Sequence, residues 1–154
     1  MESMSGSETG GERPTIVVDR PIEQVFDFIS DLDKAPQWAP QMGPIVERSG
    51  PVSEGMSFGE VRRFLGRRSV ARWTFARVER PRLMELRMRW GPLSGWFAYH
   101  FEPAGPSATR ITQDLRFRLG GPLAPLSRMI TSEATKEETR ELVRLKALLE
   151  GAPA

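Results

Sequence analysis

"ERPRLMELRMRWGPLSGWFAYHFEPAG", residues 79–105, determines how the rest of the chain is interpreted. Apolar and polar residues alternate on both sides of its central turn signal, in "LMELRMRW" before the turn and in "GWFAYHFE" after it. This period of two predicts two antiparallel strands joined by a short turn, with one apolar face and one polar face. The stretch therefore predicts a one-sided sheet that covers a core.

The rest of the chain extends this pattern. Further turn signals at "SGPVSEG", "LGRR" and "EPAGPSA" separate segments too short to hold crossover helices, so the strands are expected to pair antiparallel. Before them, "PTIVVD" (14–19) predicts a first strand, and "DRPIEQVFDFISDLDKAPQW" (19–38) changes to helical spacing. After them, residues 123–150 predict a long helix closed by Gly151. We predict an α+β fold: a seven-stranded antiparallel sheet wrapped around a long C-terminal helix, with two short helices after the first strand.

Alternation also predicts the strand registers. One pair defines each of three hairpins: Trp90 with Gly95, Phe75 with Leu86, and Tyr99 with Gln113. The predicted inward face is consistently apolar and comprises Ala71, Trp73, Phe75, Met84, Leu86, Met88, Trp90, Phe97, Tyr99, Phe101, Ile111, Leu115 and Phe117.

Tyr99 and His100 are the only tyrosine and the only histidine of the chain. Because they are successive residues of a strand, their side chains are expected to point to opposite faces and cannot act together on one substrate. Tyr99 is predicted to face the core, and His100 to face outward in register with Glu85 and Thr112.

Composition limits the classes of function. The chain has 154 residues, 39% hydrophobic and 27% charged, as expected of one soluble globular domain. No cysteine and a single histidine argue against disulfides and a metal site, and we expect no cofactor. A net charge of +2 from scattered arginines suggests no nucleic-acid partner, and no apolar run approaches the ~20 residues of a membrane span.

The first residues, "MESMSGSETGGE" (1–12), are small and polar and lack the features of a signal peptide. They are expected to form a disordered tail on a cytoplasmic protein, and residues 13–151 to form a single domain.

The order of predicted elements resembles the helix-grip fold of the START-like (SRPBCC) superfamily. The stretches that carry the resemblance are "PIEQVFDFISDLDKAPQW", "ERPRLMELRMRWGPLSGWFAYHFEPAG" and "ATRITQDLRFRLGG", which look like the bacterial polyketide cyclase/dehydrase branch. The resemblance covers about residues 14–150. It implies a cavity closed by the C-terminal helix, with Trp38 near the cavity mouth, whereas the alternative role of Trp38 is to hold its helix to the sheet.

Tyr99 and Gln113 have two interpretations. They form either a hydrogen-bonded pair in a filled core, or a polar anchor that orients a ligand in an apolar cavity. Glu60 and Arg62 are similarly open. A two-residue turn at Gly66-Arg67 would place both side chains on the cavity face of the sheet, where they pair with each other or bind a ligand. A bulge would instead turn them to the solvated face.

The long helix loses its apolar stripe in the middle, at "SEATKEETRE". A helix with this pattern lies over solvent or over a hollow. Glu133, Glu137 and Glu141 continue the inner face, and they are either solvated or directed into a cavity. On the outer face of the sheet, Trp96 either stacks on neighbouring arginines or centres a homodimer contact; the protein is otherwise expected to be a monomer.

Together these patterns predict a protein that stores, transports or senses a hydrophobic small molecule, such as an aromatic polyketide or lipid. The predicted ligand-binding residues are Trp38, Trp73, Met88, Trp90, Phe97, Tyr99, Gln113 and Glu137. The alternative is a polyketide cyclase/dehydrase-type enzyme, which would act by positioning its substrate and by acid–base assistance. Its catalytic candidates are Tyr99, Arg62 and Glu60.

Overall fold

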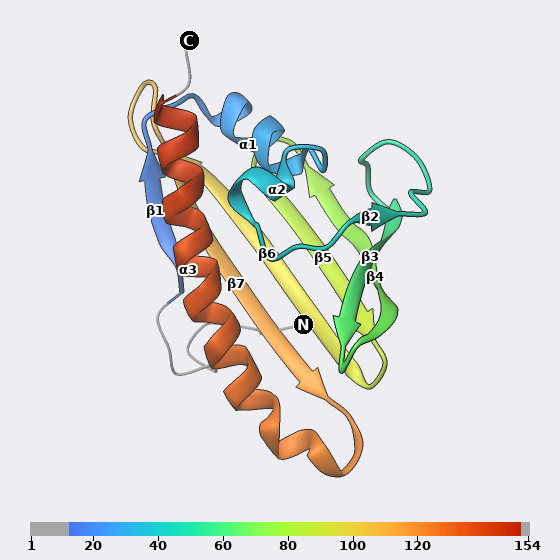
Figure 1. Cartoon of the computed structure of the whole chain (residues 1–154). Coiled ribbons are helices and arrows are strands. Elements are labelled where there is room, and N and C mark those ends of the chain that lie inside the picture. Colours follow the sequence, from blue (N-terminus) through green and yellow to red (C-terminus); the bar gives the residue numbers. More distant parts are fainter. Residues whose placement is uncertain (1–12, 152–154) are drawn as a thin grey trace.

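The computed structural model describes residues 13–151. The predicted tail, residues 1–12, lies outside the described residues. Figure 1 shows the elements in chain order: β1 (Thr15–Val18), α1 (Ile22–Ser30), α2 (Ala35–Trp38), β2 (Ile45–Val46), β3 (Ser57–Phe64), β4 (Arg67–Glu79), β5 (Leu83–Trp90), β6 (Leu93–Pro103), β7 (Thr109–Leu119), the 3-10 helix η2 (Gly121–Leu126) and α3 (Ser127–Gly151). This order confirms the predicted pair of short helices after the first strand and the long C-terminal helix.

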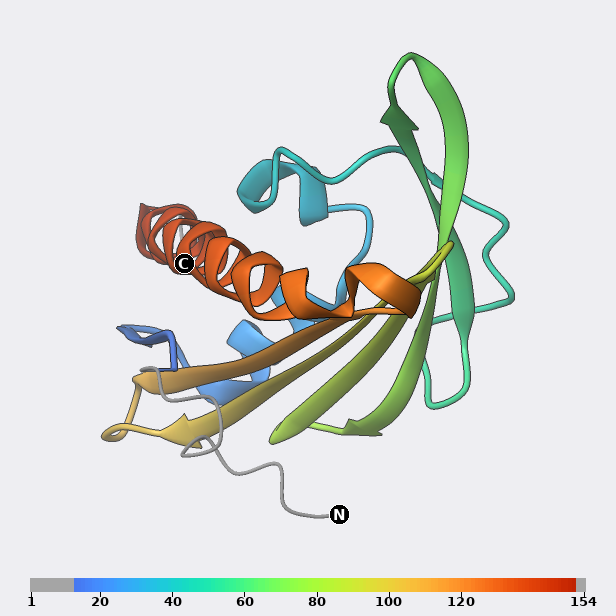
Figure 2. The ribbon, with the colours of Figure 1, turned by 90° about the horizontal axis from the view of Figure 1, so that it is seen from below.

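The seven strands form one antiparallel sheet in the order β1-β7-β6-β5-β4-β3-β2. From β2 to β7, strands that follow one another along the chain pair with each other, as expected where the connections are too short for crossover helices. The first strand instead pairs with the last. The sheet curls, and α3 lies across its concave side (Figure 2), which confirms the helix-grip fold.

Two of the three predicted hairpin registers are confirmed. Phe75 pairs with Leu86 between β4 and β5, and Tyr99 pairs with Gln113 between β6 and β7. The β4–β5 ladder shifts by one residue between Phe75 and Arg77, and Met84, which lies beyond the shift, still faces the core. The inward face of these four strands is therefore the predicted one.

The predicted register of β5 with β6 was wrong by two residues. Trp90 pairs with Leu93 rather than with Gly95. The turn is shorter than expected because Gly91 adopts a φ of +57° and, with Pro92, completes a two-residue hairpin turn. Since side chains alternate with a period of two, the shift changes the partners and leaves every residue on its predicted face.

The shift corrects the predicted partners on the outer face. His100 lies opposite Leu83, and not opposite Glu85 as predicted. The His100 side chain is 44% exposed, and its Nε2 atom lies 3.5 Å from Asp114 Oδ2. Trp96 lies opposite Arg87 on this face and is partly exposed.

The β3–β4 hairpin turns at Leu65-Gly66, one residue earlier than predicted. Glu60 pairs with Ala71, and both Glu60 and Arg62 lie on the concave face, as the predicted turn implied. The bulge that would have turned them outward is absent from this hairpin.

The short helices close one end of the concave face. In α1, the residues at helical spacing, Val25, Phe26 and Ile29, are buried. The helix α2 carries Trp38, which is 5% exposed, and the backbone carbonyl of Trp38 accepts a hydrogen bond of 3.1 Å from Arg144 Nη1 on α3. This contact connects α2 to the long helix.

The two halves of α3 have different surroundings. In the C-terminal half, Leu142, Leu145 and Leu149 are at most 2% exposed and belong to the hydrophobic core. In the N-terminal half, Met129 is 57% exposed. The first half is therefore not held by a buried apolar stripe. Within residues 13–151, no helix is long and apolar enough to cross a membrane.

We predict that Leu145→Ala lowers the free energy of unfolding by about 2–5 kcal/mol, because Leu145 is 0% exposed and its removal leaves a cavity under α3. The measurement is urea unfolding followed by tryptophan fluorescence. Val143→Ala is the matched control on the same helix, since Val143 is 57% exposed, and it should change stability by less than about 0.5 kcal/mol. Equal effects of the two changes would contradict the placement of α3.

Candidate functional site

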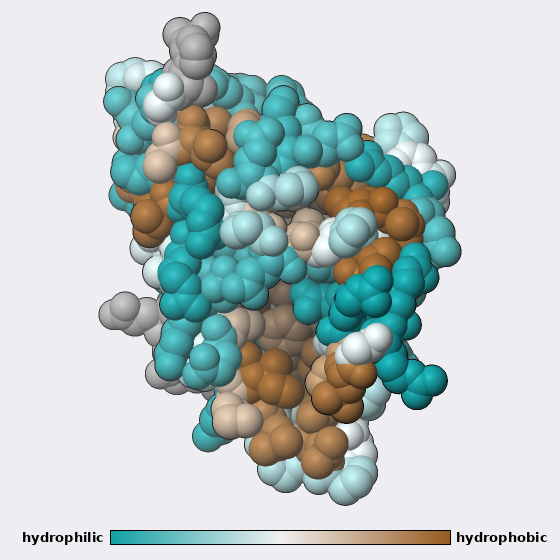
Figure 3. Space-filling model, in the orientation of Figure 1, coloured by the Kyte–Doolittle hydropathy of each residue, from teal (hydrophilic) through white to brown (hydrophobic). Residues whose placement is uncertain are grey.

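A cavity of about 670 Å³ lies between the concave face of the sheet and the N-terminal half of α3. Figure 3 shows its opening as a hollow in the surface of the molecule, beside α3. The structure brings nine of the residues proposed from the sequence to this cavity: Trp38, Glu60, Arg62, Trp73, Met88, Trp90, Phe97, Tyr99 and Glu137. The polar middle of α3, which was expected to lie over solvent or over a hollow, therefore lies over a hollow.

Aromatic rings form the wall of the cavity on the sheet. The ring centroids of Trp73 and Phe97 are 5.1 Å apart, and those of Phe97 and Phe117 are 5.4 Å apart in an edge-to-face arrangement. Gly95 makes this packing feasible, because a Cβ atom there would lie 3.0 Å from the Phe117 ring. Rings in such contact form a rigid apolar surface on which a flat ligand can lie.

Glu60 is buried and fully hydrogen-bonded at the edge of this wall. Its carboxylate accepts hydrogen bonds of 2.9 Å from the backbone N–H of Gly43 and from Trp73 Nε1, and Arg62 Nη2 lies 3.3 Å away. The close approach requires glycine at position 43, where a Cβ atom would lie 1.8 Å from the carbonyl oxygen of Val61. Three donors compensate the charge of Glu60, so it serves to fix Trp73 and Arg62 in place.

Arg62 is only partly used by these contacts. Its guanidinium lies 5.3 Å from the Trp90 ring centroid, in cation–π geometry, and its Nε atom is buried without a hydrogen-bond partner. An arginine held in this way can offer its remaining N–H groups to a carbonyl or an anionic group in the cavity.

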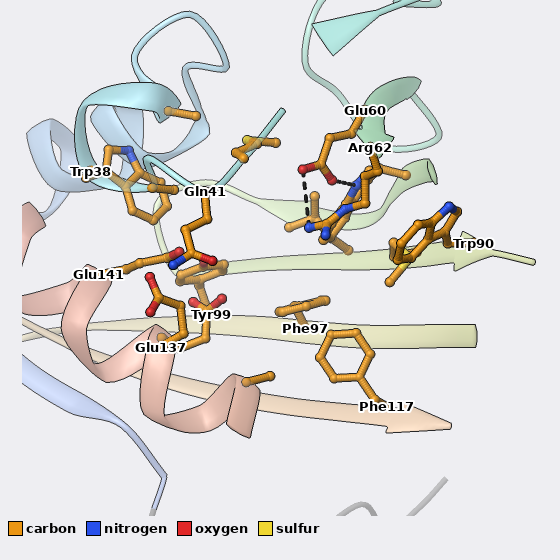
Figure 4. Close-up of a pocket in the computed structure, with 18 of the residues that line it drawn as sticks. Trp38, Gln41, Glu60, Arg62, Trp90, Phe97, Tyr99, Phe117, Glu137 and Glu141 are labelled. Carbon is orange, nitrogen blue, oxygen red and sulfur yellow. Dashed lines mark hydrogen bonds and ion pairs between the residues drawn. The ribbon is translucent and has the colours of Figure 1, made fainter. Parts of the chain in front are cut away.

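A second polar group lies across the cavity, where Tyr99 on β6 faces Glu137 and Glu141 of α3 (Figure 4), and Glu138 of the same helix also lines the cavity. Tyr99 is 6% exposed and Glu141 is 7% exposed. Glu137 pairs with Arg140 through Oε1, whereas its Oε2 atom and the Oε1 atom of Glu138 are buried without a partner. Neither oxygen makes a hydrogen bond of normal geometry, so each can accept one from a ligand.

Burial changes the protonation of this group. Burial raises the pKa of Glu138 to about 7, and the charge of Glu137 adds to the shift. Burial and repulsion by Glu138 raise the pKa of Glu141 to about 9. Burial, together with the two carboxylates, raises the pKa of Tyr99 well above its ordinary value. Near neutral pH, the Tyr99 and Glu141 groups therefore carry protons that they can donate, and Glu138 can either donate or accept.

Gln113 differs from the other predicted ligand-binding residues, because it does not line the cavity. It pairs with Tyr99 in the sheet and is 0% exposed, and no hydrogen bond of normal geometry joins its amide atoms to a neighbour. The reason is its position on β7, the strand against which α3 packs. Gln113 supports Tyr99 from the side and does not face a ligand directly.

Sequence reasoning missed Glu138 and left Glu141 as one of several helix charges. A signal was present, since Glu138 and Glu141 lie seven and four residues before Leu145, on the same face of the helix. Extending the buried stripe of the C-terminal half backward would have placed both over the cavity. Within residues 13–151, no group of three or more histidine, aspartate or glutamate side chains is arranged to hold a metal ion.

The raised carboxyl pKa values predict a pH dependence of stability. The folded protein binds more protons than the unfolded chain between pH ~4.5, the ordinary glutamate value, and pH ~9. The contribution of these groups is therefore fully present below pH ~4.5 and is lost as the pH rises through about 7 to 9.

Glu141→Gln should reduce this loss, and Glu133→Gln, which changes an exposed residue of the same helix, should not. The measurement is the free energy of unfolding of each protein across this pH range. An identical pH dependence in wild type and Glu141→Gln would contradict the buried, protonated state of Glu141.

The fold agrees with that of known proteins. The family described as "Polyketide cyclase / dehydrase and lipid transport" matches residues 13–150. By sequence, no curated protein matches the chain. Among solved structures, TTHA0849 from Thermus thermophilus is similar with a TM-score of 0.67 and 14% identity, over 93% of this chain and 99% of that one.

Two further structures share the fold. A START superfamily protein from Mycobacterium smegmatis matches with a TM-score of 0.67 and 17% identity, over 88% of this chain and 97% of that one. The di-domain ARO/CYC BexL from the BE-7585A biosynthetic pathway matches with a TM-score of 0.68 and 16% identity, over 90% of this chain but 45% of that one. This chain thus spans about half of BexL. Since the family match covers nearly all of its length, the chain belongs to the polyketide cyclase/dehydrase and lipid transport family, and it shares the fold of the START superfamily protein.

Proposed function

We propose that the protein binds a hydrophobic small molecule in the cavity between the sheet and α3. The observation that carries this proposal is the cavity itself: its volume of about 670 Å³ lies within the usual range of roughly 300–1,000 Å³ for small-molecule sites. Large apolar side chains line most of it. A protein that needed only a stable core would fill this space, because an empty apolar cavity costs stability.

The aromatic wall supplies the affinity in this proposal. A flat apolar ligand that lies on Trp73, Phe97 and Phe117 would bury its own surface and that of the three rings, and each Å² removed from water contributes roughly 25 cal/mol. The wall is already rigid, since Glu60 holds Trp73 and Gly95 admits the Phe117 ring. The protein therefore loses little side-chain entropy when a ligand binds.

The two polar groups supply orientation. Arg62 offers hydrogen-bond donors on one side of the cavity, while Glu141 and Tyr99 offer acceptors and protons on the other (Figure 4), together with Glu138. The complementary ligand is an elongated apolar molecule with an acceptor at one end and a donor at the other. Aromatic polyketides and lipids with a polar head both have this character, and both agree with the family description.

The alternative function is a cyclase or dehydratase reaction on a poly-ketone chain. One observation favours it: Glu138, with a pKa near 7, lies beside the Tyr99 hydroxyl, and both groups are buried. A carboxyl group with this pKa is suited to general acid–base work, and a neutral phenol can stabilise an enolate oxygen. Arg62 would polarise a second carbonyl. Glu60 is fully paired, so the structure favours a positioning role for it over a catalytic one.

Tyr99→Phe distinguishes the two functions. If the cavity only binds, the change removes one hydrogen bond and should weaken the binding of 1-aminoanthracene by at most about tenfold, or roughly 0.5–1.5 kcal/mol. If the cavity catalyses cyclisation, the hydroxyl stabilises charge that develops only in the transition state, and its loss should cost ~10²–10³ in rate. The measurements are a fluorescence titration and a turnover assay with a linear poly-β-ketone thioester, on the same protein.

His100→Ala is the matched control, because His100 neighbours Tyr99 and lies on the outer face. It should leave both binding and turnover unchanged. We expect the wild type to bind the probe and to leave the thioester unconverted. Turnover that collapses in Tyr99→Phe while binding persists would establish the enzyme instead.

A further inference from the structure

The cavity opens toward an end of the molecule that carries positive charge without negative charge. Strands β3, β5 and β7 all end there, and η2 and the start of α3 follow (Figure 1). The segments concerned, residues 61–70, 86–97 and 115–132, contain nine arginines and no aspartate or glutamate. Glu60 is buried beneath this end, and the next acid along α3, Glu133, lies 3.3 Å from Lys136 Nζ.

Exposed apolar side chains gather at the same end. Seven large hydrophobic residues are exposed in the described part of the chain, and five of them form two clusters here, which we call the apolar rim. Phe64 and Leu65 lie at the tip of the β3–β4 hairpin, and Leu123, Leu126 and Met129 lie on η2 and the first turn of α3. Figure 3 shows the brown surface that collects below the hollow.

The apolar rim borders the cavity. Met129 is 57% exposed and also lines the cavity, and the Phe64 ring packs edge-on against Trp90, another lining residue, at 6.3 Å between centroids. A surface that contacts the rim would therefore lie directly at the cavity opening.

Leu65 is an unfavourable residue for folding. It is 85% exposed, and it has a φ of +52° in a two-residue turn with Gly66. Asparagine, aspartate or glycine is the ordinary residue in that conformation, and an exposed leucine there gains no packing while bearing backbone strain. Contact with an apolar phase outside the protein would compensate both costs.

We propose that the apolar rim inserts into an anionic lipid surface, with the surrounding arginines on the lipid headgroups. Exposed apolar side chains flanked by cations are the combination that binds such an interface. A second copy of the chain is a poor occupant, because it would bring one arginine-rich end against another. An acidic protein would neutralise the arginines. However, the apolar rim consists of two separate projecting clusters, and a protein partner would need a groove shaped to fit both. A fluid lipid surface can receive both clusters without such a groove.

The test is flotation of the full chain with vesicles of phosphatidylcholine alone and of phosphatidylcholine with phosphatidylglycerol. We expect binding only to the phosphatidylglycerol vesicles, and weaker binding as salt increases. Leu65→Asn should lower vesicle affinity about tenfold while leaving thermal stability equal or higher, since asparagine suits the turn. Arg67→Gln with Arg68→Gln should lower affinity by roughly fivefold per charge.

Val143→Asn is the control, because Val143 is exposed on the far half of α3, and it should leave vesicle binding unchanged. Equal binding by Leu65→Asn and wild type, or binding that does not depend on phosphatidylglycerol, would overturn the proposal. Absence of vesicle binding together with saturable binding to a small acidic carrier protein, reduced by Leu65→Asn, would overturn it in favour of a protein partner. Vesicle binding tests the apolar rim, whereas the 1-aminoanthracene titration tests the cavity. Either proposal can therefore fail without the other.

Discussion

The burial of Leu142, Leu145 and Leu149 against the sheet is the interaction on which the rest of the structure depends. It fixes the C-terminal half of α3 over β1 and β7, and a straight helix must then continue across the wider part of the curled sheet. There the helix bears polar residues, so it spans the concave face and does not fill it. The cavity is a consequence of this geometry: a strongly curved sheet meets a helix that is apolar along only part of its length.

The same constraint produces the electrostatics of the site. Because α3 is held at its C-terminal end, Glu138 and Glu141 lie on its inner face, opposite Tyr99 and away from water. Their raised pKa values follow from this enforced burial. On the other side of the cavity, Glu60 has three donors and acts as a fixed support for Arg62 and the aromatic wall. Glu60 thus has a structural role, whereas Glu138 and Glu141 remain available to a ligand.

Alternation in residues 79–105 and in the neighbouring strand segments predicted the inward face of the sheet, and the fold also needed the order of the helical segments before and after the strands. Of the nine proposed residues that line the cavity, Met88, Trp90, Phe97 and Tyr99 lie in that stretch. The register error between β5 and β6 did not affect the predicted inward face, because a shift of two residues keeps each side chain on the same face. The same shift made Glu85 the wrong predicted partner of His100, whereas Thr112 lies opposite His100 as predicted. Gln113 lies opposite Tyr99 as predicted but does not line the cavity. That separation depends on how α3 packs on β7, a tertiary contact that no local pattern specifies. Glu138 was missed because a charged residue in a helix is ordinarily solvated, and only the backward extension of the leucine stripe shows otherwise.

The most direct test of the account is a ¹H–¹⁵N NMR titration of the protein with 1-aminoanthracene, which has an aromatic body and one hydrogen-bond donor. The account predicts saturable one-to-one binding. The shift changes should centre on the aromatic wall at Phe97 and Phe117, on Tyr99 and on the 137–141 segment of α3, while the outer face around Trp96 stays unperturbed. Absence of saturable binding, or shift changes centred on Trp96, would contradict the claim that the cavity is the functional site.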